Sequence, residues 1–233
     1  MSRSTLDKLR MRAPKRPRTA AVVERERGQL TRLERVVDVL YALALFQTIA
    51  LLPQPTAAEL DVDGGLALGM WNARDEFLMP IVGIGLVLIY WGQNNLLFGN
   101  LDRTDERHAA SAVFQVTFVM LFGYFIRMGA GVGDRSDILA AQSVCLLLAG
   151  LAAISGWRYA QRHGLLDPDG LSGNEIQALG QRISVEPTVA AITIPIAWLG
   201  PLAYTLTFLL GIPIVSWLFR LFTQAPSEEE PSP

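Results

Sequence analysis

Cysteine and histidine are scarce in this chain: Cys145 is the single cysteine, and His108 and His163 are the two histidines. One cysteine excludes an intramolecular disulfide and any CxxC-type metal or redox centre. The two histidines lack the HExxH spacing of zinc proteases, and the glycines of residues 129–133 lack the Lys-Ser/Thr pair of a phosphate-binding loop. We therefore predict that the protein is not an enzyme and holds no metal and no cofactor.

Charge is nearly absent from several long stretches of the sequence. The 233 residues are 51% hydrophobic, and the apolar residues are grouped in blocks separated by short polar loops. Blocks of this length are typical of helices that cross a bilayer. The sequence therefore predicts an all-α integral membrane protein in which the lipid bilayer is the main surrounding medium.

The charges are divided unevenly along the chain. Of the 20 Lys and Arg residues, 11 precede Val36, and no nucleic-acid motif accompanies them, so we expect a contact with anionic lipid and none with nucleic acid. Residues 1–31 are predicted to form a basic cytoplasmic arm and residues 32–222 a transmembrane domain. Residues 223–233 are predicted to form an acidic, proline-rich, disordered tail.

The apolar blocks predict six spans. The first four cover residues Val36–Leu52, Phe77–Phe98, Ala109–Met128 and Ile138–Tyr159, the third being ended by the glycines of residues 129–133. Residues 161–186 are predicted to include a short interfacial helix. The last block, Pro187–Phe222, is too long for one span, and Gly200-Pro201 is the natural break between two. A single long kinked helix, giving five spans, is the alternative.

The predicted topology has a definite orientation. Six spans place both termini on one side of the membrane, and the basic residues near the N-terminus place that side in the cytoplasm. The first loop, between Pro53 and Glu76, carries mostly acidic charge and is then expected outside. We expect the protein in a bacterial-type plasma membrane.

The first span carries a regular stripe of side chains. Helical steps of three or four residues from Val36 reach Leu40, Leu43, Gln47 and Ala50, which therefore share a face. One interpretation is a pore wall in which Leu43 forms a hydrophobic constriction and Gln47 a polar ring above it. The other is a helix–helix seam with one hydrogen bond from Gln47. The sequence leaves both open.

Polar residues also gather at the predicted cytoplasmic ends of the first two spans. Asp38 lies six residues after Arg32, on another side of the helix, so these two need partners elsewhere, whereas Arg35 is close enough for a local ion pair. Asn94 and Asn95 end the second span at the depth expected for Asp38. They either bond to Arg32 and Asp38 or mark the interfacial end of that helix.

Two segments resemble the transmembrane protein 175 family of potassium-permeable channels. Its members open the first span with a motif commonly written RLEAFSD, which corresponds here to residues 32–38, RLERVVD. Their second span ends in a tryptophan, a His-His pair and a charged link, matched here by Trp91, Asn94-Asn95 and residues 101–105. The chain departs from the family at Val36-Val37, which replace Phe-Ser, and at the two asparagines.

The resemblance implies a function and a set of residues. It implies a homo-oligomer, a tetramer in bacterial members, in which the first spans surround a pore that conducts cations passively, with potassium as the permeant ion. Leu43, Phe46, Gln47 and Ala50 would line that pore, although Phe46 replaces a small residue and narrows it. Arg32, Asp38, Asn94 and Asn95 would tie the first two spans together. A non-conducting scaffold or accessory subunit of the same fold is the alternative, and a small transporter is a weaker third interpretation.

Overall fold

A computed structural model describes residues 20–54, 57, 67–68, 71, 74–133 and 135–223. The helices in this part of the chain are α2 (Ala20–Ile49), α5 (Arg74–Phe98), α6 (Glu106–Val132), α7 (Ser136–His163), α8 (Gly173–Arg182), α9 (Val185–Ile196), the 3₁₀ helix η1 (Ala197–Leu199) and α10 (Pro201–Thr223). Extended structure within the described residues is limited to one isolated bridge between Leu101 and Leu166. The predicted all-α class is therefore confirmed.

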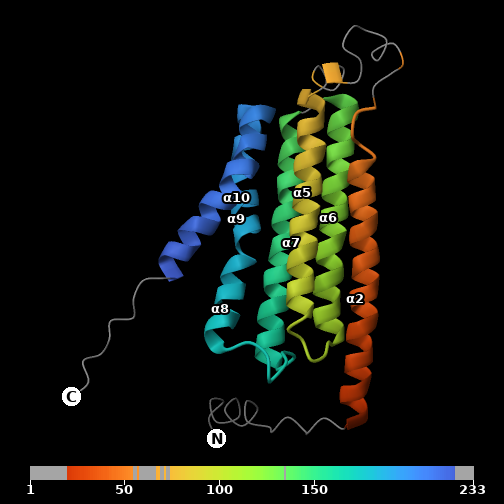
Figure 1. The fold of residues 1–233 in the computed structure, drawn as a ribbon, viewed down its shortest axis with the longest axis vertical. Coiled ribbons are helices and arrows are strands. Elements are labelled where there is room, and N and C mark those ends of the chain that lie inside the picture. Colours follow the sequence, from red (N-terminus) through yellow and green to blue (C-terminus); the bar gives the residue numbers. More distant parts are fainter. Residues whose placement is uncertain are drawn as a thin grey trace, which may run out of the picture.

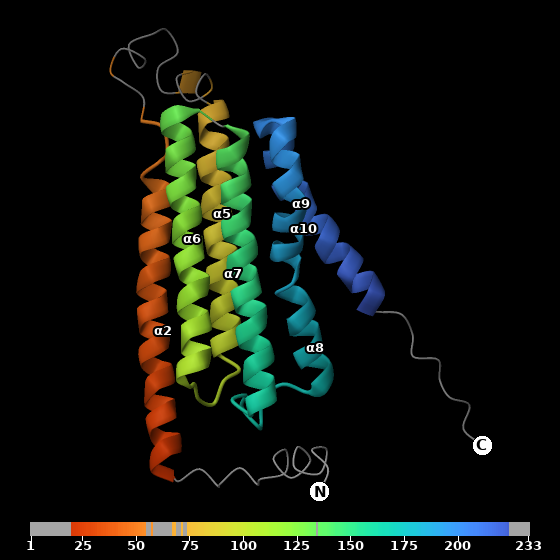
Figure 2. The ribbon, with the colours of Figure 1, turned by 180° about the vertical axis from the view of Figure 1, so that it is seen from behind.

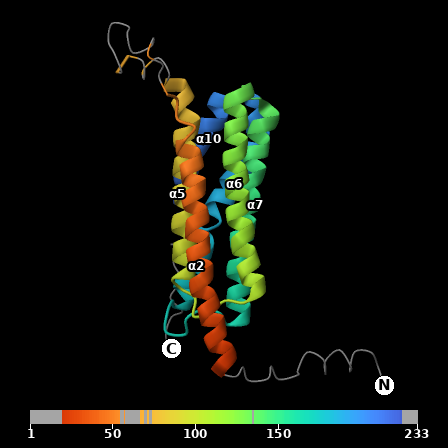
Figure 3. The ribbon, with the colours of Figure 1, turned by 90° about the vertical axis from the view of Figure 1, so that its right-hand side faces the viewer.

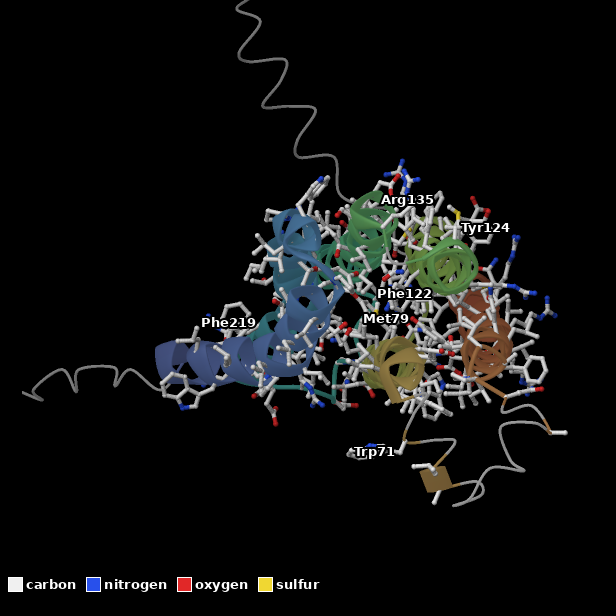
Figure 4. All side chains as sticks on the ribbon, turned by 90° about the horizontal axis from the view of Figure 1, so that it is seen from above. Trp71, Met79, Phe122, Tyr124, Arg135 and Phe219 are labelled. Atoms are coloured by element: carbon white, nitrogen blue, oxygen red, sulfur yellow. The ribbon has the colours of Figure 1, made fainter. Side chains whose placement is uncertain are left out.

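The helices form an elongated bundle (Figure 1). α2 packs on α5 and α6, α7 packs on α6 and α9, and α10 packs on α9. Seen from behind, α2 and α10 occupy opposite edges of the molecule (Figure 2), and the view from above shows the same arrangement (Figure 4). The second half of α10 leaves the bundle at an angle. We call the end at which α2 begins and α7 ends the basal end.

Four helices are long and apolar enough to cross a bilayer: they cover residues Glu76–Phe98, Glu106–Val132, Ser136–His163 and Pro201–Phe219. α2 runs beside them along the bundle axis, and its first half is richer in charge. The chain is thus an integral membrane protein, as the hydropathy pattern predicted.

α2 is much longer than the predicted first span. It begins at Ala20 instead of Val36 and ends at Ile49, followed by turn residues up to Leu52. Glu, Arg, Gln and Leu are strong helix formers, so the charged segment before Val36 continues the helix out of the apolar layer. Residues 20–31 of the predicted arm are therefore helical. Residues 1–19, residues 224–233 of the predicted tail, and most of the acidic first loop lie outside the described residues.

The glycines after Met128 do not end the third span. α6 continues through Gly129 and Gly131 to Val132 and ends at Gly133, whose φ of 88° is unfavourable for other residues. A glycine within a helix costs only about 1 kcal/mol relative to alanine, and the neighbouring α7 supports this segment through its packing on α6.

The predicted break at Gly200-Pro201 is confirmed. Gly200 has a φ of 106°, and the chain reverses there from α9 and η1 into α10 instead of kinking. The five-span alternative is therefore wrong. α9 has 12 residues and is about 18 Å long, so α8 below it supplies the remaining length on that side of the bundle. The predicted short helix within residues 161–186 is α8, which rises toward α9 (Figure 1).

The core lies between α5, α6, α7 and α9. Tyr90, Val116, Phe122 and Ala149 are fully buried there, and Figure 4 shows Phe122 pointing into the middle of the bundle. α7 and α9 pack closely, and the side chain of Pro187 lies directly against Gly150. A filled core of this kind leaves no wide passage through the described helices of a single copy.

Candidate functional site

α2 exposes an apolar stripe along its outer face. The stripe consists of Val36, Val39, Leu43, Phe46 and Ala50, spaced alternately by three and four residues. Val36, Val39 and Leu43 are 53%, 60% and 50% exposed, and Phe46 is 71% exposed. Figure 3 shows α2 along the outside of the bundle. The 3–4 spacing is the one by which helices form a seam with other helices.

The opposite face of α2 is packed on its own bundle. It consists of Leu30, Leu33, Val37, Tyr41, Ala44 and Thr48, all of them buried. These residues recur every three or four positions, so one helix presents two distinct faces. α2 is therefore fixed in rotation, with Leu43, Phe46 and Ala50 turned away from α5 and α6.

Gln47 lies at the edge of the stripe, next to α6. A Cβ placed on Gly123 would lie 3.6 Å from the Gln47 amide oxygen, so this amide lies against the α6 backbone. Leu40, which the predicted stripe included, is half-buried. Val39 and Phe46 take the positions on the outer face that the sequence pattern assigned to Leu40 and Gln47.

Asp38 is bound by a residue of α5 that the sequence interpretation did not assign to it. The Trp91 indole N–H donates a hydrogen bond of 3.0 Å to the Asp38 carboxylate. This bond joins α2 to α5 at the depth where a link between the first two spans was predicted. A carboxylate at the edge of the apolar layer requires such a partner.

The other members of the predicted polar network are spread apart. Asn94 is buried and lines a small cavity of about 10 Å³ between α5, α6 and α7, together with His108 and Gln115. That volume holds about one water molecule. Arg32 and Asn95 are exposed, and within the described residues neither makes an ion pair or hydrogen bond.

The basal end holds a cluster of ion pairs. The Arg27 guanidinium donates to the Asp102 carboxylate at 2.9 and 2.6 Å. Arg103 pairs with Glu26 at 3.3 Å and with Asp102 at 3.2 Å, and it donates to the Gly164 carbonyl oxygen at 2.7 Å. The charged half of α2 is thus joined to the α5–α6 and α7–α8 links. The sequence offered opposite charges but no indication of which would meet.

The N-terminus of α6 is fixed at the same end. The Asp105 carboxylate caps the helix by accepting from the His108 backbone N–H at 3.0 Å, and it accepts from the Tyr159 hydroxyl at 2.8 Å. Partial burial acts to raise the pKa of Asp105, but these hydrogen bonds outweigh that effect and leave the pKa below its ordinary value.

A buried carboxyl group lies at the start of α9. Glu186 is 7% exposed and accepts a hydrogen bond from the Gln93 side-chain amide of α5. The Gln93 amide oxygen is buried and without a partner among the described residues. Buried carboxyl groups within membrane helices require such donors. Within the described residues, His, Cys, Asp and Glu side chains form no group of three or more that would bind a metal ion.

No known family model matches the chain, and no curated protein matches it in sequence. Among solved structures, the chain is similar to a crystal structure described as that of a lysosomal potassium-selective channel TMEM175 homolog from Chamaesiphon minutus. The sequence identity is 13% and the TM-score 0.60, and the match covers 85% of this chain and 100% of the other. The chain therefore has the fold of a TMEM175 homologue, as the two sequence motifs predicted.

Proposed function

We propose that the protein is a cation channel whose conducting path lies between several copies of the chain and is lined by α2. The observation that carries this proposal is the exposed stripe on α2. An apolar stripe with 3–4 spacing, here over the second half of α2, is typical of a surface that faces other helices. The filled core supports a path between copies in preference to one within a single copy.

The proposed mechanism is passive conduction through a hydrophobic constriction. Leu43 from each copy, with Phe46 one turn further, narrows the path, and such a constriction closes by excluding water. Ala50 leaves the outer end wider. Gln47 adjoins the stripe on the side of α6 and contributes an amide beside the constriction. The permeant ion is potassium, by analogy with the TMEM175 homologue, and the oligomer is a homotetramer.

The remaining expectations form part of the same proposal. The polar link between the first two helices is made by Asp38 and Trp91, and Arg32, Asn94 and Asn95 are its further proposed members. The basic residues before Val36 favour a cytoplasmic basal end, which places both termini inside a bacterial-type plasma membrane.

Potassium flux from proteoliposomes tests the proposal. Leu43→Ser is expected to raise the flux several-fold because a polar side chain lets water enter the constriction. Phe46→Ala is expected to raise it as well. Leu151→Ser on α7 is the matched control, since Leu151 is 46% exposed and Leu43 50%. Equal flux for both serine variants would remove Leu43 from the gate. A particle mass measurement in detergent counts the copies.

Phe46 favours a second candidate function, a non-conducting membrane scaffold. It is the most exposed of the large side chains of the stripe, and a ring of such aromatic groups blocks a narrow path. Potassium flux from the unmodified protein distinguishes the two functions. No flux from the unmodified protein or from Phe46→Ala would favour the scaffold.

A further inference from the structure

An amphipathic cleft lies between α7, α8 and α10, on the side of the bundle away from α2. Its volume is about 420 Å³. Its lining combines apolar residues, among them Ile154, Ile183 and Phe219, with polar residues, among them Arg158, Gln161 and Gln177. Figure 4 shows Phe219 on α10, at the opposite side of the molecule from α2. This volume is large enough for a small organic molecule and is larger than the volume of a single small ion.

The cleft contains a buried donor without a partner. Trp157 is 2% exposed, and its indole Nε1 has no hydrogen-bond partner among the described residues. A Cβ placed on Gly180 would lie 3.6 Å from this nitrogen. Gly180 lines the cleft and not the small cavity beside Asn94, so the N–H lies on the side of the cleft. A buried N–H without an acceptor is costly, and a ligand oxygen in the cleft would satisfy it.

The charge of the residues that line the cleft indicates the charge of its ligand. Arg158 is the one charged residue among those that line it. Arg158 is exposed and, within the described part of the chain, forms no ion pair. A guanidinium and an indole N–H that both line one cleft are donors for an anionic oxygen group such as a phosphate.

The position of the cleft along α7 indicates which kind of molecule carries that phosphate. Trp157 and Arg158 lie where the apolar sequence of α7 gives way to Gln161, Arg162 and His163. Tryptophan and arginine at such a border lie at the level of lipid headgroups. The apolar lining residues then suit the acyl chains of a lipid and the polar lining residues its headgroup.

We propose that this cleft binds one anionic phospholipid of the basal leaflet. The Arg158 guanidinium and the Trp157 indole N–H hold its phosphate, and Ile154, Ile183 and Phe219 contact its acyl chains. The proposal does not depend on whether the protein conducts ions, and its test measures binding alone.

Native mass spectrometry of the full chain in detergent tests the proposal. The probes are phosphatidylglycerol and phosphatidylcholine with the same acyl chains, with glycerol phosphate as a soluble competitor. We expect the unmodified protein to bind phosphatidylglycerol more tightly than phosphatidylcholine. Arg158→Gln is expected to weaken phosphatidylglycerol binding about tenfold, because one charge-assisted contact is lost. Arg162→Gln, one turn further along α7 and outside the cleft, is the matched control and should bind as the unmodified protein does.

A second variant tests the steric part of the site. Gly180→Ala places a methyl group against the indole N–H at an ordinary contact distance and improves the helix propensity of α8. We expect weaker phosphatidylglycerol binding together with an unchanged or higher apparent Tm. Equal binding by Arg158→Gln and Arg162→Gln would overturn the proposal, and so would equal affinity for the two lipids. If glycerol phosphate at equal concentration displaced all bound phosphatidylglycerol, the ligand would be a soluble phosphate compound and the lipid proposal would be wrong.

Discussion

The contact between Gly150 and Pro187 leads to a quantitative prediction. A Cβ added at Gly150 would lie 2.5, 2.7 and 2.8 Å from the Cβ, Cγ and Cδ atoms of Pro187. An ordinary contact begins at about 3.4 Å, and a proline ring has no rotamer by which it can move away. The Gly150→Ala variant must therefore push α9 away from α7 or strain both helices.

The size of the effect is estimated against a control. Overpacking of this kind costs about 1–3 kcal/mol. Replacing a helical glycine by alanine also gains up to about 1 kcal/mol of helix propensity. Gly85→Ala on α5 makes the same gain without a clash, because a Cβ there meets nothing within 4 Å. The difference between the two variants isolates the clash, about 1–3 kcal/mol in favour of Gly85→Ala.

Apparent Tm in detergent, followed by tryptophan fluorescence at one fixed scan rate, measures this difference. At about 2–4 °C per kcal/mol for a chain of this size, Gly150→Ala should melt about 2–12 °C below Gly85→Ala. A fixed scan rate is required because membrane proteins often unfold irreversibly. An apparent Tm for Gly150→Ala equal to or above that of Gly85→Ala would refute the close packing of α7 on α9.

Three further predictions concern the polar contacts. Trp91→Phe removes the hydrogen-bond donor to Asp38 and should lower the free energy of unfolding by about 1 kcal/mol. This value is small because Asp38 is exposed, and it is measured as a change in apparent Tm. The Asp105 carboxyl has a lowered pKa, so its contribution to stability is present above its ordinary pKa and is lost as the pH falls through the lowered value; Asp105→Asn should therefore flatten the acid limb of a plot of apparent Tm against pH. Gln93→Leu leaves the buried Glu186 without its amide donor and should cost about 1–3 kcal/mol, again measured as apparent Tm.

Each of these three predictions has a control. Trp217→Phe removes an exposed indole from α10 and should leave apparent Tm unchanged. Asp169→Asn changes an exposed carboxyl group in the α7–α8 link and should leave the acid limb as it is. Asn95→Leu replaces an exposed amide two residues after Gln93. If Gln93→Leu and Asn95→Leu have the same apparent Tm, the hydrogen bond to Glu186 contributes nothing to stability.

Local features of the fold were predictable from the sequence. Apolar blocks located α5, α6 and α7 because crossing a bilayer needs about 20 apolar residues in a row. Gly200-Pro201 marked a reversal because glycine accepts the positive φ and proline begins a new helix. The start of α2 was missed because hydropathy detects the membrane layer and is blind to a helix that continues into water.

The contacts of the candidate site were much less predictable. The pairs Asp38–Trp91 and Gln93–Glu186 join residues 53 and 93 positions apart. Which polar groups meet depends on how each helix is rotated about its axis, and span prediction does not fix that rotation. The same uncertainty explains why the helical pattern placed Leu40 and Gln47 on the stripe beside Val36, Leu43 and Ala50, while the exposed face holds Val39 and Phe46 instead.

The length of α2 has a mechanical consequence. Its 30 residues measure about 45 Å, whereas the apolar layer of a bilayer is about 30 Å thick. Because the helix is unbroken, a force applied near Ala20 is transmitted as by a stiff rod to Leu43 and Phe46. The ion pairs made by Arg27 and Arg103 attach the basal half of this helix to the α5–α6 link. Salt screens surface charges, so a higher ionic strength at the basal surface would weaken these ion pairs and loosen the attachment of α2.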